Sequence, residues 1–407
     1  MFRKAKNIIF ASITVILSLV VADLILHVAA FVSPRANEVM SIVAKYAPDE
    51  RLGHRPNPGY PGHDENGFRN LRVPQTADIV ALGDSQTYGT GVESEEAWPR
   101  VLESLDGRFV YSIAFGGYGP LQSLLLWDIA ASLKPQVVIE GMYAGNDLYD
   151  SFSMVYGKKG KLPERKTNDS SLLKIIAQAE KSRPLNKIVQ KNYRVGKTVS
   201  KFEKFRKNVK AWIVEHSKVY ALYRRARYEL LRLEEEQRSD EEQWQKAKAY
   251  AAKHPQYAHA FSSESAQTVL TPKFRLSALN LNDPRIREGQ RIAYEAILQL
   301  HQSVTRNGAR FIVLLIPTKE LVFGEQAKDM AVPEYHRLVQ QERQFWQETK
   351  SFLDEHAIEY IDALAPLQQQ LETGIQPYAV SDDGHPNAHG HRAIAGQIHS
   401  YLATGNQ

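Results

Sequence analysis

The sequence predicts an α/β protein built on a parallel sheet with helices on both faces, a helical insertion and an N-terminal transmembrane helix. Three observations indicate this architecture. Short apolar runs alternate with stretches of helical periodicity, as buried parallel strands and their crossover helices do. A long basic segment interrupts the alternation. A 25-residue apolar run stands near the N-terminus, directly behind a cluster of basic residues.

The apolar run extends from Ile8 to Val32 and exceeds the roughly 20 residues that span a bilayer. Basic residues precede it at positions 3, 4 and 6, which favours a cytoplasmic N-terminus and an exported body. We therefore expect residues 1–34 to be an uncleaved signal anchor with Asp23 toward the far interface. This places a single-pass protein in the inner membrane, its main domain facing the periplasm or exterior. A cleaved secretory signal and a buried core helix are the alternatives.

Composition excludes several classes of function. The 407 residues are 43% hydrophobic and 24% charged, which is ordinary globular usage and argues against disorder or a polytopic membrane protein. The chain has no cysteine, so disulfides, thiolate metal sites and cysteine nucleophiles are excluded.

The elements of the main domain follow in chain order. Residues 33–75 are rich in Pro and Gly and predict an irregular linker. Apolar runs then predict five strands, over 78–82, 109–114, 136–142, 310–316 and 359–361. Helical stretches are expected over 98–105, 120–133, 286–305, 333–356 and 391–402. The domain would thus comprise two halves, residues 35–150 and 281–407.

The interrupting segment, residues 151–280, is predicted to be a basic helical insertion. Over 151–233 it carries 22 Lys/Arg and 6 Asp/Glu, a net charge of +16 in a chain whose formal net charge is +5. The basic side chains either form a solvated helical face or contact an anionic glycan or phospholipid headgroups. Binding to nucleic acid is not expected, because no nucleic-acid-binding motif accompanies the charge.

Chemistry-bearing residues follow the ends of the predicted strands. The first strand runs into Gly83-Asp84-Ser85, the second into a glycine-rich loop that contains Gly117, and the third into Asn146. Ligands of open parallel sheets bind at this carboxyl edge. Near the C-terminus, Asp382-Asp383-Gly384-His385 puts a carboxylate two or three residues before an imidazole. Taken alone, each motif also fits a turn or helix cap, and His385 with His389 and His391 could belong to a metal site.

Together the four blocks resemble the SGNH, or GDSL-type, hydrolase family over roughly residues 65–150 and 305–402. The resemblance implies a three-layer, flavodoxin-like fold in which Ser85 is the nucleophile and His385 is the general base. An aspartate would orient the imidazole. The N–H groups of Ser85 and Gly117 and the side chain of Asn146 would form the oxyanion hole. The implied mechanism requires neither a metal nor an organic cofactor.

Some positions leave choices open. The family's usual Asp-x-x-His spacing points to Asp382, which we favour, whereas the Asp-x-His spacing of related acetyltransferases points to Asp383. Ser112 stands where the second block commonly has Asn. Arg69 and Lys319, in accessory segments, are candidates for binding substrate.

These features predict a membrane-anchored, extracytoplasmic serine esterase that removes acyl groups, most simply acetyl, from a carbohydrate. One alternative is an O-acetyltransferase acting on an exported polysaccharide, which would resemble the SGNH-type alginate O-acetyltransferases. Another, of a different class, is a non-catalytic glycan-binding assembly subunit that uses the basic insertion as its contact surface.

Overall fold

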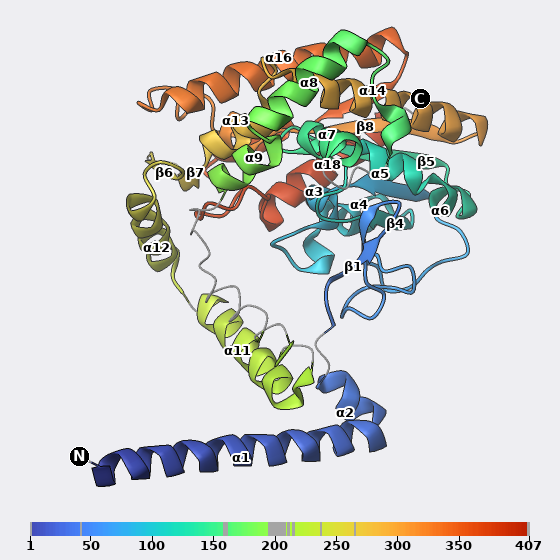
Figure 1. Cartoon of the computed structure of the whole chain (residues 1–407). Helices are drawn as coiled ribbons and strands as arrows, with labels where there is room; N and C mark the ends of the chain where they lie inside the picture. Colours follow the sequence, from blue (N-terminus) through green and yellow to red (C-terminus); the bar gives the residue numbers. More distant parts are fainter. Residues whose placement is uncertain are drawn as a thin grey trace. The chain divides into compact units, whose positions relative to one another are not determined.

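The computed structural model describes residues 2–40, 43–157, 162–193, 209, 212–213, 216–236, 238–263 and 266–404. The chain divides into two compact units. One comprises residues 1–44 and 196–241, and the other comprises residues 45–195 and 242–407. Figure 1 shows the elements of both units along the chain.

The smaller unit consists, in its described part, of α1 (Phe2–Val32), α2 (Pro34–Val39) and α11 (Lys218–Glu236). Its Ile9–Val32 stretch has a mean hydropathy of 2.6 and contains no buried residue in its apolar window, so it is long and apolar enough to cross a membrane; a signal sequence has the same properties. The carboxylate of Asp23 interrupts this stretch and accepts hydrogen bonds from the hydroxyl of Ser217 and the N–H of Val219, both at 2.9 Å. Asp23 therefore satisfies donors at the start of α11.

The main unit is built on a parallel sheet whose described strands lie in the order β4-β3-β5-β8-β9. In chain order this is 2-1-3-4-5, the flavodoxin-like order, with its topological switch point between β3 and β5. All five strands agree with the prediction to within two residues. Their bounds are β3 Ile79–Gly83, β4 Val110–Ala114, β5 Val137–Tyr143, β8 Arg310–Ile316 and β9 Glu359–Asp362.

Helices cover both faces, which confirms the three layers. Along β3, Val80 and Leu82 face one hydrophobic cluster while Ile79 and Ala81 face the other, as strand alternation requires. The first cluster is closed by α5 (Pro120–Leu125), α6 (Trp127–Ser132), α7 (Asp147–Tyr156), α14 (Pro284–Arg306) and α16 (Pro333–Glu355). The second is closed by α4 (Trp98–Asp106), α17 (Leu364–Glu372) and α18 (Ala388–Thr404).

The insertion expected over 151–280 does not form a separate module, so its predicted limits are wrong. Its first helices, α8 (Ser170–Ser182) and α9 (Leu185–Tyr193), belong to the main unit, as does α13 (Pro272–Leu279). In this unit α8 packs on α14, α13 packs on α16 and α9 packs on α13, and their buried apolar side chains belong to the core. The remaining elements of this region are η2 (Pro163–Arg165), α12 (Asp240–Lys253) and the hairpin β6 (His259–Ser262) with β7 (Gln267–Leu270).

The segment expected to be an irregular linker contains an antiparallel hairpin, β1 (Tyr46–Asp49) with β2 (Gly53–Pro56). Each strand has four residues, too few for its alternation to stand out in the sequence. The short helices η1 (Ser94–Glu96), α3 (Ser85–Tyr88) and α15 (Lys319–Val322) complete the described elements.

Candidate active site

Ser85 is the first residue of α3, directly after the carboxyl end of β3. The turn requires Gly83, whose φ of +143° is unfavourable for other residues and whose added Cβ would lie 3.0 Å from the carbonyl oxygen of Gly141. Asp84 then caps the helix by accepting a 2.8 Å hydrogen bond from the N–H of Gln86. The strand, turn and cap thus fix the serine at the switch point of the sheet.

His385 reaches this serine from the loop before α18. Its Nε2 lies 2.9 Å from the Ser85 hydroxyl oxygen, and its Nδ1 lies 2.5 Å from a carboxylate oxygen of Asp383. The serine hydroxyl also lies 3.4 Å from Asp84, a longer contact than the one to the imidazole. The three side chains form a continuous chain of hydrogen bonds that can carry the serine proton to the imidazole.

The carboxylate on the imidazole is that of Asp383, so our preference for Asp382 is wrong. The same Asp383 oxygen accepts a 3.0 Å hydrogen bond from the backbone N–H of His385, which closes a short Asx-type turn. That turn places the carboxylate against Nδ1, and no hydrogen bond joins Asp382 to the imidazole within the described residues. Burial alone would raise the pKa of Asp383, but its hydrogen bonds from His385 and the charges of His385 and Lys319 lower it to about 2.

Two buried cations support the loop that carries these residues. The ammonium of Lys319 donates hydrogen bonds of 2.7 and 2.8 Å to the carbonyl oxygens of Ser381 and Asp383. Burial lowers the pKa of Lys319 to about 8. The guanidinium of Arg275, on α13, packs so closely on Gly384 that a Cβ there would overlap it. Both cations therefore hold the backbone of the catalytic loop in place.

We expected Lys319 and Arg69 to be candidates for binding substrate, but the side chains of both are hydrogen-bonded to backbone carbonyl oxygens. Lys319 is buried and engaged with the loop carbonyls. The guanidinium of Arg69 donates to the carbonyl oxygens of Gly89 and Val92, at 2.8 and 2.9 Å. Arg69 thereby holds the segment that follows α3, so both cations act on the backbone around the site.

The glycine-rich loop after β4 lies against the serine. A Cβ added to Gly116 would be 3.8 Å from the Cβ of Ser85, and Gly117 has a φ of +77°, which favours glycine. His54 on β2 fixes the loop, because its Nε2 lies 2.9 Å from the carbonyl oxygen of Gly116. A donor role for the N–H groups of Ser85 and Gly117 remains a proposal that this proximity supports.

Asn146 follows β5 at the same edge of the sheet, but its amide is already engaged. Its nitrogen donates a 2.5 Å hydrogen bond to Asp150, one turn further along α7. No hydrogen bond joins Asn146 to Ser85 or Gly117 within the described residues. An oxyanion-stabilising role for Asn146 would require its second amide hydrogen to point at the substrate.

Acidic side chains are buried beneath the serine. Asp84, Glu140 and Asp147 are all fully buried. Burial raises the pKa of Asp84 to about 6 and that of Glu140 to about 8, and it also raises the pKa of Asp147. Their mutual repulsion adds to the effect on Glu140 and Asp147. The floor of the site is therefore a cluster of carboxyl groups that resist ionisation.

The histidines that suggested a metal site differ in their exposure to solvent. His389 is exposed, whereas His391 is fully buried, with its Nδ1 accepting a 3.3 Å hydrogen bond from the N–H of Trp98. Burial lowers the pKa of His391 to about 3, so its ring is neutral and serves the packing of α18 on α4.

Two residues beside the site escaped the sequence analysis. His54 lies in the segment read as a linker, and Arg275 lies in the segment read as an insertion. Neither stands in a motif, and their proximity depends on the hairpin and α13 packing onto loops that are distant in the chain. A single sequence contains no signal for either contact.

No protein-family model and no curated protein matches the chain. Among solved structures it is similar to a protein from Desulfitobacterium hafniense described as lipolytic and of the G-D-S-L family, at 11% identity and a TM-score of 0.32. That match covers 79% of this chain and 97% of the other. Phospholipase A1 from Streptomyces albidoflavus is similar at 11% identity and a TM-score of 0.33, covering 81% of this chain and 98% of the other. Because the TM-scores are low, the roles of the site residues rest on the geometry around Ser85.

Proposed function

We propose that the protein is an SGNH-type serine ester hydrolase that acts through an acyl-Ser85 intermediate. The observation that carries the proposal is the hydrogen-bonded chain from Ser85 through His385 to Asp383. A nucleophile, a base and an orienting acid within hydrogen-bond distance at the switch point of a parallel sheet are the requirements of acyl transfer to serine.

In the first half-reaction, the Ser85 oxygen attacks the ester carbonyl carbon while Nε2 of His385 takes the hydroxyl proton. The carbonyl becomes a tetrahedral oxyanion, which the N–H groups of Ser85 and Gly117 would stabilise. When the bond from carbon to the leaving oxygen breaks, His385 returns the proton to that oxygen. An alcohol leaves and the acyl group remains on Ser85.

In the second half-reaction, water attacks the acyl carbon and His385 accepts a proton from it. Collapse of the second tetrahedral species frees the carboxylic acid and returns the proton to Ser85. Asp383 keeps its charge throughout and stabilises the imidazolium each time it forms. The low pKa of Asp383 supports this role, because the carboxylate is then ionised over the whole neutral range.

A carbohydrate ester is the proposed substrate, with acetyl as the acyl group. The cavity beside Gly117 supports it, because polar side chains such as Asp49, Gln122 and Ser153 line the space. Together with apolar neighbours such as Leu52 and Met154, these polar groups can bind both the hydroxyl groups and the C–H face of a sugar ring. The exposed apolar stretch of α1 and the basic residues before it support a membrane-anchored, extracytoplasmic enzyme.

The test uses full-length protein in detergent with p-nitrophenyl acetate as a minimal ester. We expect hydrolysis, covalent labelling of Ser85 by a fluorophosphonate, and a loss of at least ~10³-fold in kcat for Ser85→Ala. A folded Ser85→Ala protein that keeps its hydrolytic rate would refute the proposal. Retention of biological activity by that variant would favour the non-catalytic glycan-binding subunit instead.

Acyl transfer is the second candidate, because a sugar hydroxyl can replace water in the second half-reaction. The cavity beside the site could hold such an acceptor as well as a leaving alcohol. Adding an oligosaccharide to the p-nitrophenyl acetate reaction separates the two. Acetylated sugar formed faster than free acetate would identify a transferase, whereas free acetate alone identifies an esterase.

Binding of an anionic glycan or lipid by the basic segment stays a prediction. Much of that segment, including 194–208, lies outside the described residues. Salt-sensitive binding of the full-length protein to vesicles containing anionic lipid, or to an acidic polysaccharide, would support it.

A further inference from the structure

A cavity of about 610 Å³ opens beside the glycine-rich loop. One wall is the β1–β2 hairpin and the other consists of residues from α5 and α7. Gly117 lines the cavity, and the adjacent Gly116 lies against Ser85. A substrate whose ester carbonyl meets Ser85 can therefore extend its alcohol portion into this space.

The cavity has an acidic lining. It includes the carboxyl groups of Asp49, Glu50 and Asp150, and none of the lining residues, all of them in the described part of the chain, is Lys or Arg. Burial raises the pKa of Asp150 to about 7, so Asp49 and Glu50 supply most of the negative charge. Arg51 and Arg55 belong to the same hairpin, but both are exposed and neither lines the cavity. These carboxylates would repel a negatively charged sugar that entered the cavity, and no Lys or Arg side chain in the lining would offset the repulsion.

A buried acceptor adds independent evidence of a ligand. Gln122, on α5, lines the cavity although it is only 2% exposed. Its side-chain oxygen is buried and has no hydrogen-bond partner within the described residues, while its nitrogen lies 3.5 Å from the carbonyl oxygen of Gly117. Leaving a buried polar atom unpaired costs about 1–3 kcal/mol, so the site favours a ligand that supplies a donor.

We infer that this cavity selects the alcohol portion of the ester: it takes an uncharged or amino-bearing sugar and discriminates against an anionic sugar such as a uronate. Hydroxyl and ammonium groups donate to the carboxylates and to Gln122, whereas a carboxylate on the sugar can only accept. Leu52 and Met154 supply apolar surface for the C–H face of a sugar ring. The inference rests on the proposed function and names its substrate class.

The experiment compares three acetylated oligosaccharides of equal length on the full-length protein in detergent: xylo-oligosaccharide, chitosan oligosaccharide and oligogalacturonate. Acetate release gives kcat/KM for each at low ionic strength. We expect the uncharged and the cationic substrates to exceed the anionic one by at least ~10-fold, and added salt to narrow the gap. Equal use of all three substrates would overturn the inference.

Variants that remove one charge test whether the carboxylates of the cavity cause the discrimination against the anionic substrate. Asp49→Asn keeps an oxygen that can accept the hydrogen bonds from the N–H groups of Arg51 and Leu52, now at 2.8 and 2.7 Å, so the hairpin turn is retained. Glu50→Gln alters an exposed side chain and serves if the first variant misfolds. Each should raise kcat/KM on the anionic substrate by about 3- to 10-fold.

A matched control is Glu372→Gln, which removes an exposed charge on α17 outside the cavity. We expect it to leave all three ratios unchanged. An unchanged ratio in Glu50→Gln and Asp49→Asn would also overturn the inference. Hydrolysis of p-nitrophenyl acetate separates the two proposals: its absence refutes the esterase, whereas its presence without discrimination refutes only the selectivity of the cavity.

Discussion

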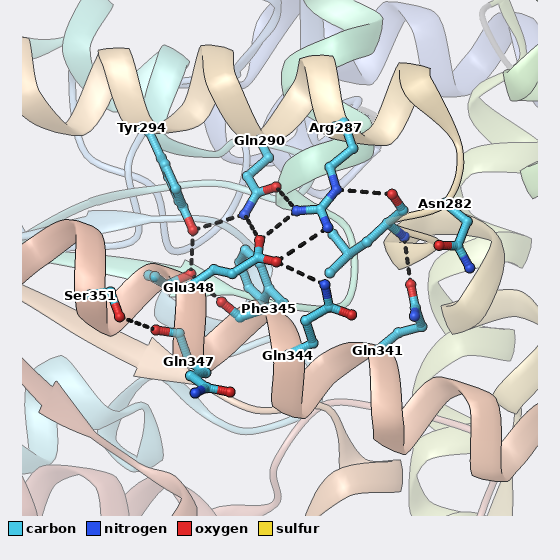
Figure 2. Close-up of polar contacts among 12 residues, drawn as sticks. Asn282, Arg287, Gln290, Tyr294, Gln341, Gln344, Phe345, Gln347, Glu348 and Ser351 are labelled. Carbon is cyan, nitrogen blue, oxygen red and sulfur yellow. Dashed lines mark hydrogen bonds and ion pairs between the residues drawn. The ribbon is translucent and has the colours of Figure 1, made fainter.

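Two polar regions of the main unit differ in whether their buried carboxyl groups are paired with a cation. Between α14 and α16, Glu348 binds Arg287 through both of its oxygens, at 2.5 and 3.2 Å, and accepts a 2.9 Å hydrogen bond from Gln290 (Figure 2). Burial would raise the pKa of Glu348, but these hydrogen bonds and the Arg287 charge lower it. Beneath Ser85, by contrast, Asp84 and Glu140 are buried, no basic side chain among the described residues is bonded to them, and their pKa values are raised.

The network between α14 and α16 has a structural role, whereas the carboxyl groups beneath Ser85 belong to the candidate active site. A paired and hydrogen-bonded network fixes two helices in register and perturbs little else. Carboxyl groups buried together without a cation lower the stability of the fold once they ionise, so such clusters are found where function requires perturbed pKa values. The variants below test this contrast in order of decreasing effect.

The largest effect is expected at the acid that orients the imidazole. Asp383→Asn should reduce kcat on p-nitrophenyl acetate by about 10²–10⁴-fold, because the amide can neither fix the tautomer nor stabilise the imidazolium. The matched control, Asp382→Asn, alters the exposed neighbour and should stay within about threefold of the parent. Equal losses in both variants would contradict the assignment of Asp383.

An intermediate effect is expected at the floor of the site. The pKa of Glu140 is about 8 in the folded protein against an ordinary 4.5, so the folded state holds a proton that the unfolded state releases. Stability should therefore fall as pH rises from about 4.5 to 8, by at most ~1.4 kcal/mol per pH unit for this group. Glu140→Gln removes that slope.

The measurement is Tm between pH 5 and pH 9 for the full-length protein in detergent. The Tm of Glu140→Gln should be close to that of the parent at pH 5 and should exceed it progressively as the pH increases. A constant difference across the range would show that Glu140 ionises normally in the folded protein.

The smallest effect is expected at the network that joins α14 and α16. Arg287→Met should cost about 1 kcal/mol in the free energy of unfolding by urea, because both partners are about one-third exposed and water screens the pair. Catalytic rate should change by less than about twofold. A loss of activity without a loss of stability would mean that the two regions are coupled, and the contrast would fail.

Much of the main unit follows from the sequence. Most of the five strands are largely apolar runs, and three of the four motifs directly follow the carboxyl ends of parallel strands. The choice between Asp382 and Asp383 could not be made in this way, since it depends on a side-chain turn closed by the backbone N–H of His385. Spacing alone fits both carboxylates.

The other predictions that differ from the structure have the same physical origin. Lys319 and Arg69 carry charge near the site, which suggests contact with substrate, but both side chains donate hydrogen bonds to backbone carbonyl oxygens of neighbouring segments. The boundaries of the basic segment were missed because high charge says nothing about which apolar residues on its helices meet the core. These outcomes depend on tertiary packing and not on local pattern.

The nucleophile and its base are separated by 300 positions in the chain. During synthesis, the serine, its cap and the glycine loop can assemble long before the loop that carries His385 exists. Ester chemistry therefore switches on only when the last strand has joined the sheet and the C-terminal loop has closed over Ser85. A nascent or truncated chain that ends before this loop would be inert toward esters, however well its first half had folded.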